Sequence, residues 1–291
     1  MSSPRPSIFG IPIDPLTCAQ VLERLQHSIA TRLPTQVVTV NPEFLIRSRT
    51  DQAFRSVLLK ADVTVSDGIG VRAAATFQNQ PLPTWQPGRI IMSLLQGVLV
   101  GGAILTRHRS LHNPLPETLS GIDLIWELAE LGATRGWRFF LLGGAPGTAK
   151  AAAATLQARF PTLIIAGAEE GIPRDKYGDQ TLRQSVAKQI SHQTPDVLFV
   201  AFGAPNQERF IAEFRDHLRV PVMMGVGGAF DFMAGTVPRA PHLIRSIGLE
   251  WFWRLIVQPW RFKRIWTAVV IFPWLVFLER QQYGGKATPV E

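Results

Sequence analysis

Residues 195–207 constrain the fold more than any other part of the chain, because they join a buried strand to a polar loop. Within them, residues 197–202 form an apolar run that has no helical period and is rich in β-branched and aromatic side chains. The run is too short for a buried helix, so it predicts a strand buried on both faces. It stops at Gly203, and a loop with Pro205 and Gln207 follows. Since ligands of parallel α/β sheets bind beyond the carboxyl ends of the strands, this segment predicts the edge of a binding site.

Two other apolar runs, at residues 137–142 and 220–226, also end in paired glycines. The glycines that follow these runs are Gly143, Gly144, Gly227 and Gly228. Three strands that each end in glycine indicate one shared site of the nucleotide-binding type. The tight turns of any doubly wound protein would give the same pattern. Neither a dinucleotide fingerprint nor a Walker lysine motif occurs in the chain, so the glycines alone leave both interpretations open.

The rest of the chain alternates between predicted strands and predicted helices. Further strands are expected at residues 8–13, 36–40, 61–66 and 163–166, and helices at 14–31, 43–59, 69–77, 120–133 and 148–156. This alternation predicts an α/β fold with a doubly wound, mostly parallel, Rossmann-like sheet. We expect this core to cover residues 1–238, followed by a basic, Trp-rich helical appendage at 239–280. The polar tail at 281–291 is expected to be disordered.

Two polar side chains follow neighbouring predicted strands. Asn41 comes after the strand at 36–40, and Asp67 comes after the strand at 61–66. Both would lie at the same edge of a parallel sheet, where they could act on a ligand. Both residue types are also good N-caps of the helices that follow, so capping and catalysis remain alternatives for Asp67.

Composition and charge limit the kind of partner. The chain has 291 residues, a net charge of +8 and a single cysteine, Cys18. One cysteine excludes an internal disulfide and fits a reducing compartment. No apolar segment typical of a secretion signal follows the first methionine. The positive charge predicts an anionic partner, for which nucleic acid, anionic lipid and a phosphorylated substrate all qualify.

The basic residues gather near the C-terminal end. Residues 239–264 hold six Lys or Arg and one acidic residue, which accounts for +5 of the +8 charges. Five of the eight tryptophans lie in the same region, at positions 251, 253, 260, 266 and 274. Tryptophan interleaved with basic residues is typical of segments at a membrane surface. Because an apolar stretch at 265–278 follows, the pattern favours a membrane surface over nucleic acid.

A second apolar segment interrupts the α/β pattern at residues 79–117. Its centre, residues 90–105, has no charge and only Ser93 and Gln96 as polar side chains. Sixteen residues are marginal for a transmembrane helix, which needs about 20. Three interpretations remain open, namely a helical insert that dips into the membrane, a buried hairpin of helices, and a true span.

Common catalytic and metal-binding signatures are absent from the sequence. The six histidines are scattered without metal-ligand spacing, and no Asp-x-Asp or Gly-x-Ser-x-Gly motif occurs. We therefore expect neither a metal nor a cofactor. A diphosphate leaving group would then need arginines or helix N-termini to stabilise its charge.

Seven short motifs occur in a fixed order along the chain. They are Val38-Thr39-Val-Asn41-Pro42-Glu43, Ala61-Asp62 through Asp67-Gly68-Ile-Gly70-Val71, Gly121-Ile-Asp123-Leu124, Phe140-Leu-Leu-Gly143-Gly144-Ala-Pro146-Gly147, Gly203-Ala-Pro205-Asn206-Gln207-Glu208, Gly225-Val-Gly227-Gly228-Ala-Phe230-Asp231-Phe232, and Arg239-Ala-Pro241 with Gly248-Leu-Glu250-Trp251. In this order the motifs resemble those of the WecG/TagA/CpsF glycosyltransferases. The resemblance covers about residues 8–264 without the insert. This sequence has Asn206 where the family motif has a lysine, and Glu117-Thr118-Leu119-Ser120 where an arginine is common.

The resemblance implies an inverting, metal-independent enzyme of cell-surface polysaccharide synthesis. Such an enzyme would move an N-acetylmannosamine-type sugar from a UDP-sugar donor to a polyprenyl-diphosphate-linked acceptor at the cytoplasmic face of the cell membrane. A non-catalytic protein that binds a nucleotide sugar or a lipid-linked sugar is the alternative. An oxidoreductase and a nucleic-acid binder are weaker alternatives, since the dinucleotide fingerprint is missing and the apolar C-terminal segment does not suit nucleic acid. A homo-oligomer is left open.

The resemblance also assigns roles to residues of this sequence. Asp67 would be the general base that deprotonates the acceptor hydroxyl. Contacts with the substrates are expected from Thr39, Asn41, Asp123, Gln207, Glu208 and Asp231, and from Arg239, Arg245, Arg254 and Arg261 of the appendage. Contacts with the nucleotide are expected from Gly143, Gly144, Gly171, Gly203, Pro205, Gly227 and Gly228.

Overall fold

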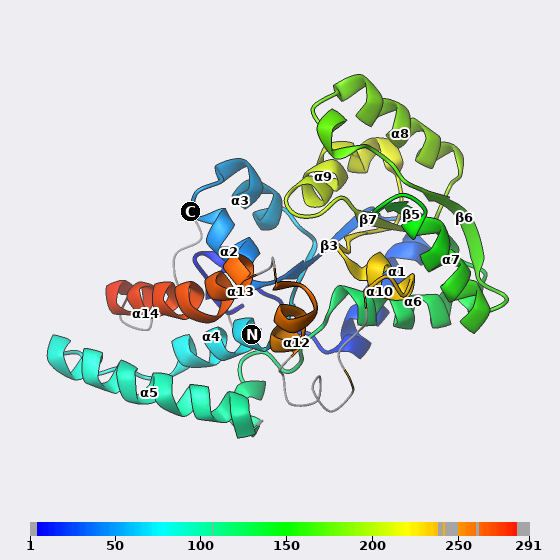
Figure 1. Cartoon of the computed structure of the whole chain (residues 1–291). Helices are drawn as coiled ribbons and strands as arrows, with labels where there is room; N and C mark the ends of the chain where they lie inside the picture. Colours follow the sequence, from blue (N-terminus) through cyan, green and yellow to red (C-terminus); the bar gives the residue numbers. More distant parts are fainter. Residues whose placement is uncertain (1–4, 107, 238–240, 242–249, 260–261, 284–291) are drawn as a thin grey trace.

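A six-stranded parallel sheet forms the centre of the computed structural model (Figure 1). The structure describes residues 5–106, 108–237, 241, 250–259 and 262–283. The strands are β3 (Thr35–Val40), β4 (Val63–Ser66), β5 (Arg138–Gly143), β6 (Ile164–Glu169), β7 (Val197–Ala201) and β8 (Val222–Gly225). Their order in the sheet is β4-β3-β8-β7-β5-β6, and every neighbouring pair is parallel. The predicted α/β class is therefore confirmed.

Helices cover both faces of this sheet, as a doubly wound fold requires. One face packs against α1 (Cys18–Thr31), α6 (Gly121–Arg135), α7 (Thr148–Arg159) and α10 (Ala229–Met233). The other packs against α2 (Pro42–Ser48), α3 (Gln52–Leu59), α4 (Ile69–Asn79), α8 (Gln180–His192) and α9 (Asn206–Leu218). Successive strand residues alternate between the two cores: Phe139 and Leu141 face one, and Phe140 and Leu142 face the other. This alternation explains why the strands appear as continuous apolar runs.

Three predicted elements differ from the structure. The strand expected at 8–13 is a small antiparallel hairpin of β1 (Ser7–Ile8) and β2 (Ile11–Pro12). The helix expected at 43–59 is two helices, because the Asp51 side chain accepts a hydrogen bond from the Phe54 amide and starts α3 anew. The strand that was expected to end at residue 166 continues through Gly167. A Cβ there would lie 2.4 Å from the Phe140 ring, so only glycine fits against it.

The apolar segment forms one long helix, α5 (Gln86–Thr106), rather than the buried hairpin that was one of the three interpretations. Most of its large apolar side chains are exposed. By length and composition, α5 is the one helix among the described residues that could cross a membrane. A short 3₁₀ turn, η1 (Arg109–His112), follows it, and a second, η2 (Arg174–Lys176), precedes α8.

The C-terminal appendage is helical where it is described. It comprises α12 (Glu250–Val257), α13 (Phe262–Trp266), a π-helical segment η4 (Thr267–Ile271) and α14 (Phe272–Tyr283). α14 lies beside α4 and α5 (Figure 1), and its Phe272 packs edge-on against Phe9 at 5.9 Å between ring centroids. Because α14 continues to Tyr283, the first three residues of the tail predicted to be disordered are helical. Residues 284–291 lie outside the described residues.

Candidate active site

The carboxyl ends of the six strands meet at one edge of the sheet, and Asp67 lies at this edge. The Asp67 amide donates a hydrogen bond to the carbonyl of Val40, at 2.7 Å, which ties the end of β4 to the end of β3. Asn41 is the next residue after Val40. The structure therefore brings the two polar side chains to neighbouring strand ends, as the sequence predicts. Because β8 and β7 follow β3 in the sheet, the loops that contain Gly227 and Gly203 continue the same edge.

The capping interpretation is correct for Asn41 and wrong for Asp67. The side-chain oxygen of Asn41 accepts hydrogen bonds from the amides of Glu43 and Phe44, at 3.0 and 3.1 Å, and so caps α2. The N-cap residue of α4 is Gly68, which has a φ of 94°. Asp67 thus lies one residue before the cap, half-buried, at the point where the chain leaves β4. This position is compatible with a catalytic role for Asp67, which stays a prediction.

Gln207 connects two of the glycine loops. Its side-chain oxygen accepts hydrogen bonds from the amides of Gly203 and Gly227, each at 3.0 Å. Both glycines have positive φ, 76° and 53°, and a Cβ at either would meet no atom within 4 Å. Their backbone is therefore open on the outer side of each loop. Gln207 itself is buried, so it holds the loops that follow β7 and β8 in place from their buried side.

Glu208 is buried beneath the same loops. Its Oε1 accepts a hydrogen bond from Gln207 Nε2 at 2.6 Å, while its Oε2 has no partner among the described residues. Burial raises the pKa of this carboxyl group to about 7, and the hydrogen bond from Gln207 opposes the shift. The Glu208 carbonyl also accepts a hydrogen bond from Gln36 Nε2 of β3, at 3.1 Å. These contacts favour a supporting role for Glu208 over the direct substrate contact that we expected.

The remaining nucleotide-site candidates are backbone turns. Gly143 and Gly144 have φ values of 100° and 90°, and the Gly144 amide bonds to the carbonyl of Ala201 at 3.0 Å. This bond joins the loop after β5 to the end of β7. A Cβ at Gly171 would lie 2.6 Å from the Phe202 ring, so a glycine at this position lets the backbone pack closely against Phe202, at the start of the loop after β7.

Pro205 and Gly228 lie where helices begin at the sheet edge. The peptide bond before Pro205 is cis, and Pro205 is the N-cap residue of α9. Gly228 is the N-cap residue of α10, with an ordinary φ of −82°. The N-terminal ends of both helices therefore lie at the edge where the loops after β7 and β8 run, and the positive ends of their dipoles would favour an anionic group there.

Thr39, Asp123 and Asp231 lie around the β3 and β8 ends. Thr39 is buried in β3, and its hydroxyl would be 3.8 Å from a Cβ on Gly121, at the start of α6. Asp123 is exposed in the first turn of α6 and accepts a hydrogen bond from the Ser120 hydroxyl at 2.5 Å. Asp231 is half-buried in α10. The structure thus gathers these three candidates from three different elements.

Most of the arginines expected to contact the substrates from the appendage lie outside the residues that the structure describes. Arg239, Arg245 and Arg261 lie outside the described residues, and Arg254 belongs to α12 without a described side chain. Arg264 instead reaches the core. Its guanidinium contacts the Glu43 carboxylate, with Nε and Nη2 each 2.8 Å from Oε2. Nothing in the sequence predicts this pair beyond the basic character of the segment, because the two residues are far apart in the chain.

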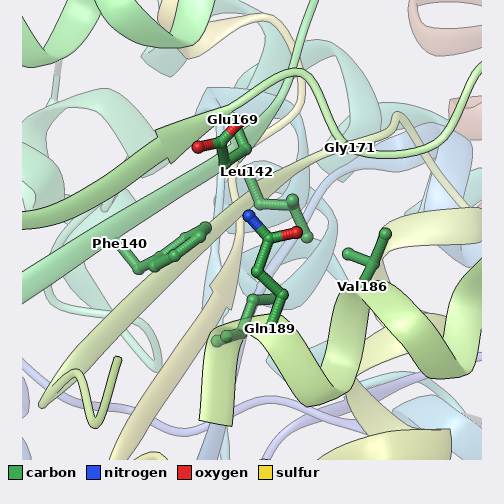
Figure 2. Close-up of a pocket in the computed structure, with 7 residues that line it drawn as sticks. Phe140, Leu142, Glu169, Gly171, Val186 and Gln189 are labelled. Atoms are coloured by element: carbon green, nitrogen blue, oxygen red, sulfur yellow. The ribbon is translucent and has the colours of Figure 1, made fainter. Parts of the chain in front are cut away.

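A small hollow lies between α8 and the β5–β6 pair, and Gly171, one of the expected nucleotide contacts, is among the residues that line it. Figure 2 shows that Gln189 points from α8 into the space beside Phe140, Leu142 and Glu169. Its volume is about 80 Å³, whereas pockets for drug-sized ligands measure roughly 300–1,000 Å³. This hollow is too small for a nucleotide sugar, and its lining includes neither Asp67 nor Gln207. We therefore place the candidate active site at the strand ends around Asp67.

Comparison with known proteins identifies close sequence relatives. Residues 6–97 and 96–285 match the glycosyl transferase WecG/TagA/CpsF family, and the two matched segments meet within α5. The match reaches beyond residue 264, where the resemblance was expected to end. An N-acetylglucosaminyldiphosphoundecaprenol N-acetyl-beta-D-mannosaminyltransferase of Bacillus subtilis strain 168 is 31% identical over 260 residues, covering 89% of this chain and 86% of the relative. A protein of the same name from Staphylococcus aureus strain NCTC 8325 is 29% identical over 267 residues, covering 91% and 89%.

Proposed function

Because the chain belongs to the WecG/TagA/CpsF glycosyltransferase family, we propose that it transfers an N-acetylmannosamine-type sugar from a UDP donor to a polyprenyl-diphosphate-linked sugar. The position of Asp67 carries this proposal. Asp67 lies at the edge where the loops after β3, β7 and β8 run side by side, and it is tied to Val40 at 2.7 Å. A carboxylate at such an edge can meet a hydroxyl group of a bound acceptor.

The proposed reaction is a single displacement with inversion. Asp67 accepts the proton of the acceptor hydroxyl as its oxygen forms a bond to the anomeric carbon of the donor sugar. The bond between that carbon and the UDP oxygen breaks at the same time, and UDP leaves with the electron pair. The positive ends of the helix dipoles would stabilise the negative charge on the diphosphate, and the loops at Gly203 and Gly227, where a Cβ would meet no atom within 4 Å, would leave room for it.

We further propose that transfer occurs at the cytoplasmic face of the cell membrane. The acceptor class is a lipid, and the appendage exposes Trp266 and Trp274 by 50% and 58%. Indole rings favour the headgroup region of a bilayer, so these side chains fit a surface contact. The contact between Arg264 and Glu43 links the same appendage to α2, next to Asn41. The acceptor and the donor site would thereby be held close together.

The test is UDP release from a panel of UDP-N-acetylhexosamines, with a polyprenyl-diphosphate-linked N-acetylglucosamine as acceptor, in detergent and with or without EDTA. We expect acceptor-dependent release from UDP-N-acetylmannosamine or its uronic acid. Asp67→Asn should lower the rate by about 10²–10⁴-fold, the usual contribution of a general base, and should leave UDP binding unchanged. Asp216→Asn, at an exposed position of α9, is the matched control and should keep the wild-type rate.

Two outcomes would contradict the proposal at different levels. A near wild-type rate for Asp67→Asn would show that another group accepts the proton. No release from any donor, with UDP binding intact, would instead favour the non-catalytic alternative or a different acceptor. In that case Asn206 and Thr118, the two departures from the family pattern, would be replaced first.

A further inference from the structure

α5 has the reverse of the pattern expected for a helix on a water-exposed surface. Its buried stripe consists of small or polar residues with one valine, namely Gly88, Ser93, Gln96, Val100 and Ala103. Its outward face is made of large apolar side chains, among which Val98, Leu99 and Leu105 are 75%, 69% and 73% exposed. A surface helix normally buries its apolar stripe and exposes its polar one. The outward face of α5 is therefore suited to an apolar surrounding.

The polar side of α5 is held by α14. Gln96 Oε1 accepts a hydrogen bond from Arg280 Nη2 at 2.6 Å, and the Ser93 hydroxyl accepts one from Gln281 Nε2 at 2.8 Å. Arg280, which is 2% exposed, also lies 4.2 Å from the centre of the Phe77 ring of α4. These buried polar contacts fix which side of α5 faces outward. The apolar face is thus a defined feature of the fold.

We propose that the outward face of α5 inserts into an anionic lipid bilayer, with the helix lying in the plane of the membrane. We call this face the α5 lipid face and define it by Ile91, Leu94, Leu95, Val98 and Leu105, which are between 55% and 75% exposed. The inference rests on the proposed function only in that both place the chain at a membrane. It assigns the insertion to a helix of the core, separate from the tryptophans of the appendage.

The charges at the rim of the face identify lipid as its occupant. No charged residue occurs between Arg89 and Arg107, while Trp85 before the helix is 60% exposed and Arg109 after it is exposed. Aromatic and cationic residues at the ends of an apolar segment suit the headgroup region of anionic lipids. A second copy of the chain would bring the same cations face to face, and like charges oppose such an association.

The buried stripe argues against a helix that crosses the membrane. It runs from Gly88 to Ala103, so one side of α5 packs on the protein for nearly its whole length. α4 and α14 lie along that side (Figure 1). A span would draw the charged Glu279 and Arg280 of α14 into the hydrocarbon, which is costly. An in-plane helix needs to bury only its outward face.

The first experiment measures flotation of the full-length chain with vesicles of mixed phosphatidylcholine and phosphatidylglycerol, without donor or acceptor. The test variant is Leu94→Gln with Val98→Gln, and the matched control is Leu33→Gln with Ile164→Gln. Leu33 and Ile164 are also exposed apolar residues. Ile164 belongs to β6, which is the outermost strand of the sheet on the side far from α5 (Figure 1). We expect the test variant to bind vesicles at least about tenfold more weakly than wild type, because two apolar side chains leave the lipid. The control should bind as wild type does.

The second experiment measures depth. Single cysteines Ile91→Cys, Val98→Cys and Leu105→Cys, in a Cys18→Ser background, carry a fluorophore that brominated lipids quench. An in-plane helix predicts the same depth for all three positions. A span predicts that positions 91 and 105 differ by about 21 Å, at 1.5 Å per residue.

Three results would overturn the proposal. The first is unchanged vesicle binding by the test variant. The second is a depth gradient along α5, which would show a span. The third is a lipid-free dimer of the wild type that the test variant abolishes while vesicle binding persists, which would make a second copy the occupant. Because no sugar substrate is present, none of these results depends on whether the proposed transferase activity is correct.

Discussion

The buried carboxyl group of Glu208 makes the stability of the fold depend on pH in a direction that can be calculated. Burial raises its pKa from 4.5 to about 7, so the folded chain retains a proton that the unfolded chain has lost. The free energy of unfolding should therefore decrease as the pH rises from about 4.5 through 7. A shift of this size corresponds to about 3 kcal/mol once Glu208 is ionised.

Glu208→Gln tests this reasoning, because glutamine keeps the shape of the side chain and an acceptor for Gln207 but has no charge. At about pH 4, below the ordinary pKa of 4.5, the variant and the wild type should have similar free energies of unfolding. At about pH 8 the variant should be more stable by up to about 3 kcal/mol. Urea unfolding followed by intrinsic fluorescence, at steps across this range, gives both values. Glu127→Gln, at an exposed position of α6, is the control and should follow the pH dependence of the wild type.

The result that would refute the argument is a constant difference in stability between wild type and Glu208→Gln across the whole range. That result would mean that Glu208 has the same protonation in the folded and unfolded chains. A smaller difference that still grows with pH would keep the direction and reduce the magnitude. The two curves should begin to separate near the ordinary pKa of 4.5, and the pH above which their difference stops growing reports the folded-state pKa.

Three further predictions follow from other contacts. Gly225→Ala should lower the free energy of unfolding by about 1–3 kcal/mol, because its Cβ would lie 2.6 Å from both Gln207 Nε2 and Glu208 Oε1. Gly178→Ala, where a Cβ would meet no atom within 4 Å, is the control. Equal melting temperatures of the two variants would contradict the packing argument. Arg264→Glu should lower transferase activity but change the free energy of unfolding by no more than about 1 kcal/mol, because the ion pair with Glu43 is half-exposed. The charge-swapped double variant, Arg264→Glu with Glu43→Arg, should recover part of the activity. No recovery would show that loss of the ion pair does not cause the lower activity. Cys18 should react with iodoacetamide about 100-fold more slowly in the folded than in the unfolded chain, because burial and nearby carboxylates raise its pKa from 9.0 to about 11. Mass spectrometry of the alkylated chain measures both rates. Equal rates would exclude the raised pKa.

Local sequence patterns were enough to predict the strands and the edge at which the site lies. β4, β7 and β8 fall within the predicted runs, and β3 and β5 each extend one residue beyond theirs, because strands buried on both faces are mostly apolar. Asn41 and Asp67 could be placed at one edge from parallel topology alone. The break between α2 and α3 was missed, although the cap at Asp51 has a local signal, because the helical pattern on either side of it is continuous.

Contacts between distant parts of the chain could not be predicted in the same way. Nothing local indicates that the Gln207 side chain bonds to Gly227, or that Arg264 reaches Glu43. Each of these bonds depends on the order of strands in the sheet, which the alternation of strands and helices does not determine. For α5, the apolar composition left three interpretations open, and only the buried positions of Ser93 and Gln96 show which side faces outward.

The place of β8 in the sheet affects how the chain can reach its folded state. β8 lies between β3 and β7, and it pairs Val222 with Thr35, residues that are synthesised far apart in time. At about 5–20 residues per second, the ribosome needs on the order of 10–40 s to make the intervening chain. During this interval the β3–β4 pair has an open edge of unpaired backbone, which is a hazard for aggregation. β8, the last of the described strands to be made, therefore both closes the sheet and joins the half that bears Asp67 to the half that bears the loops after β5 and β7.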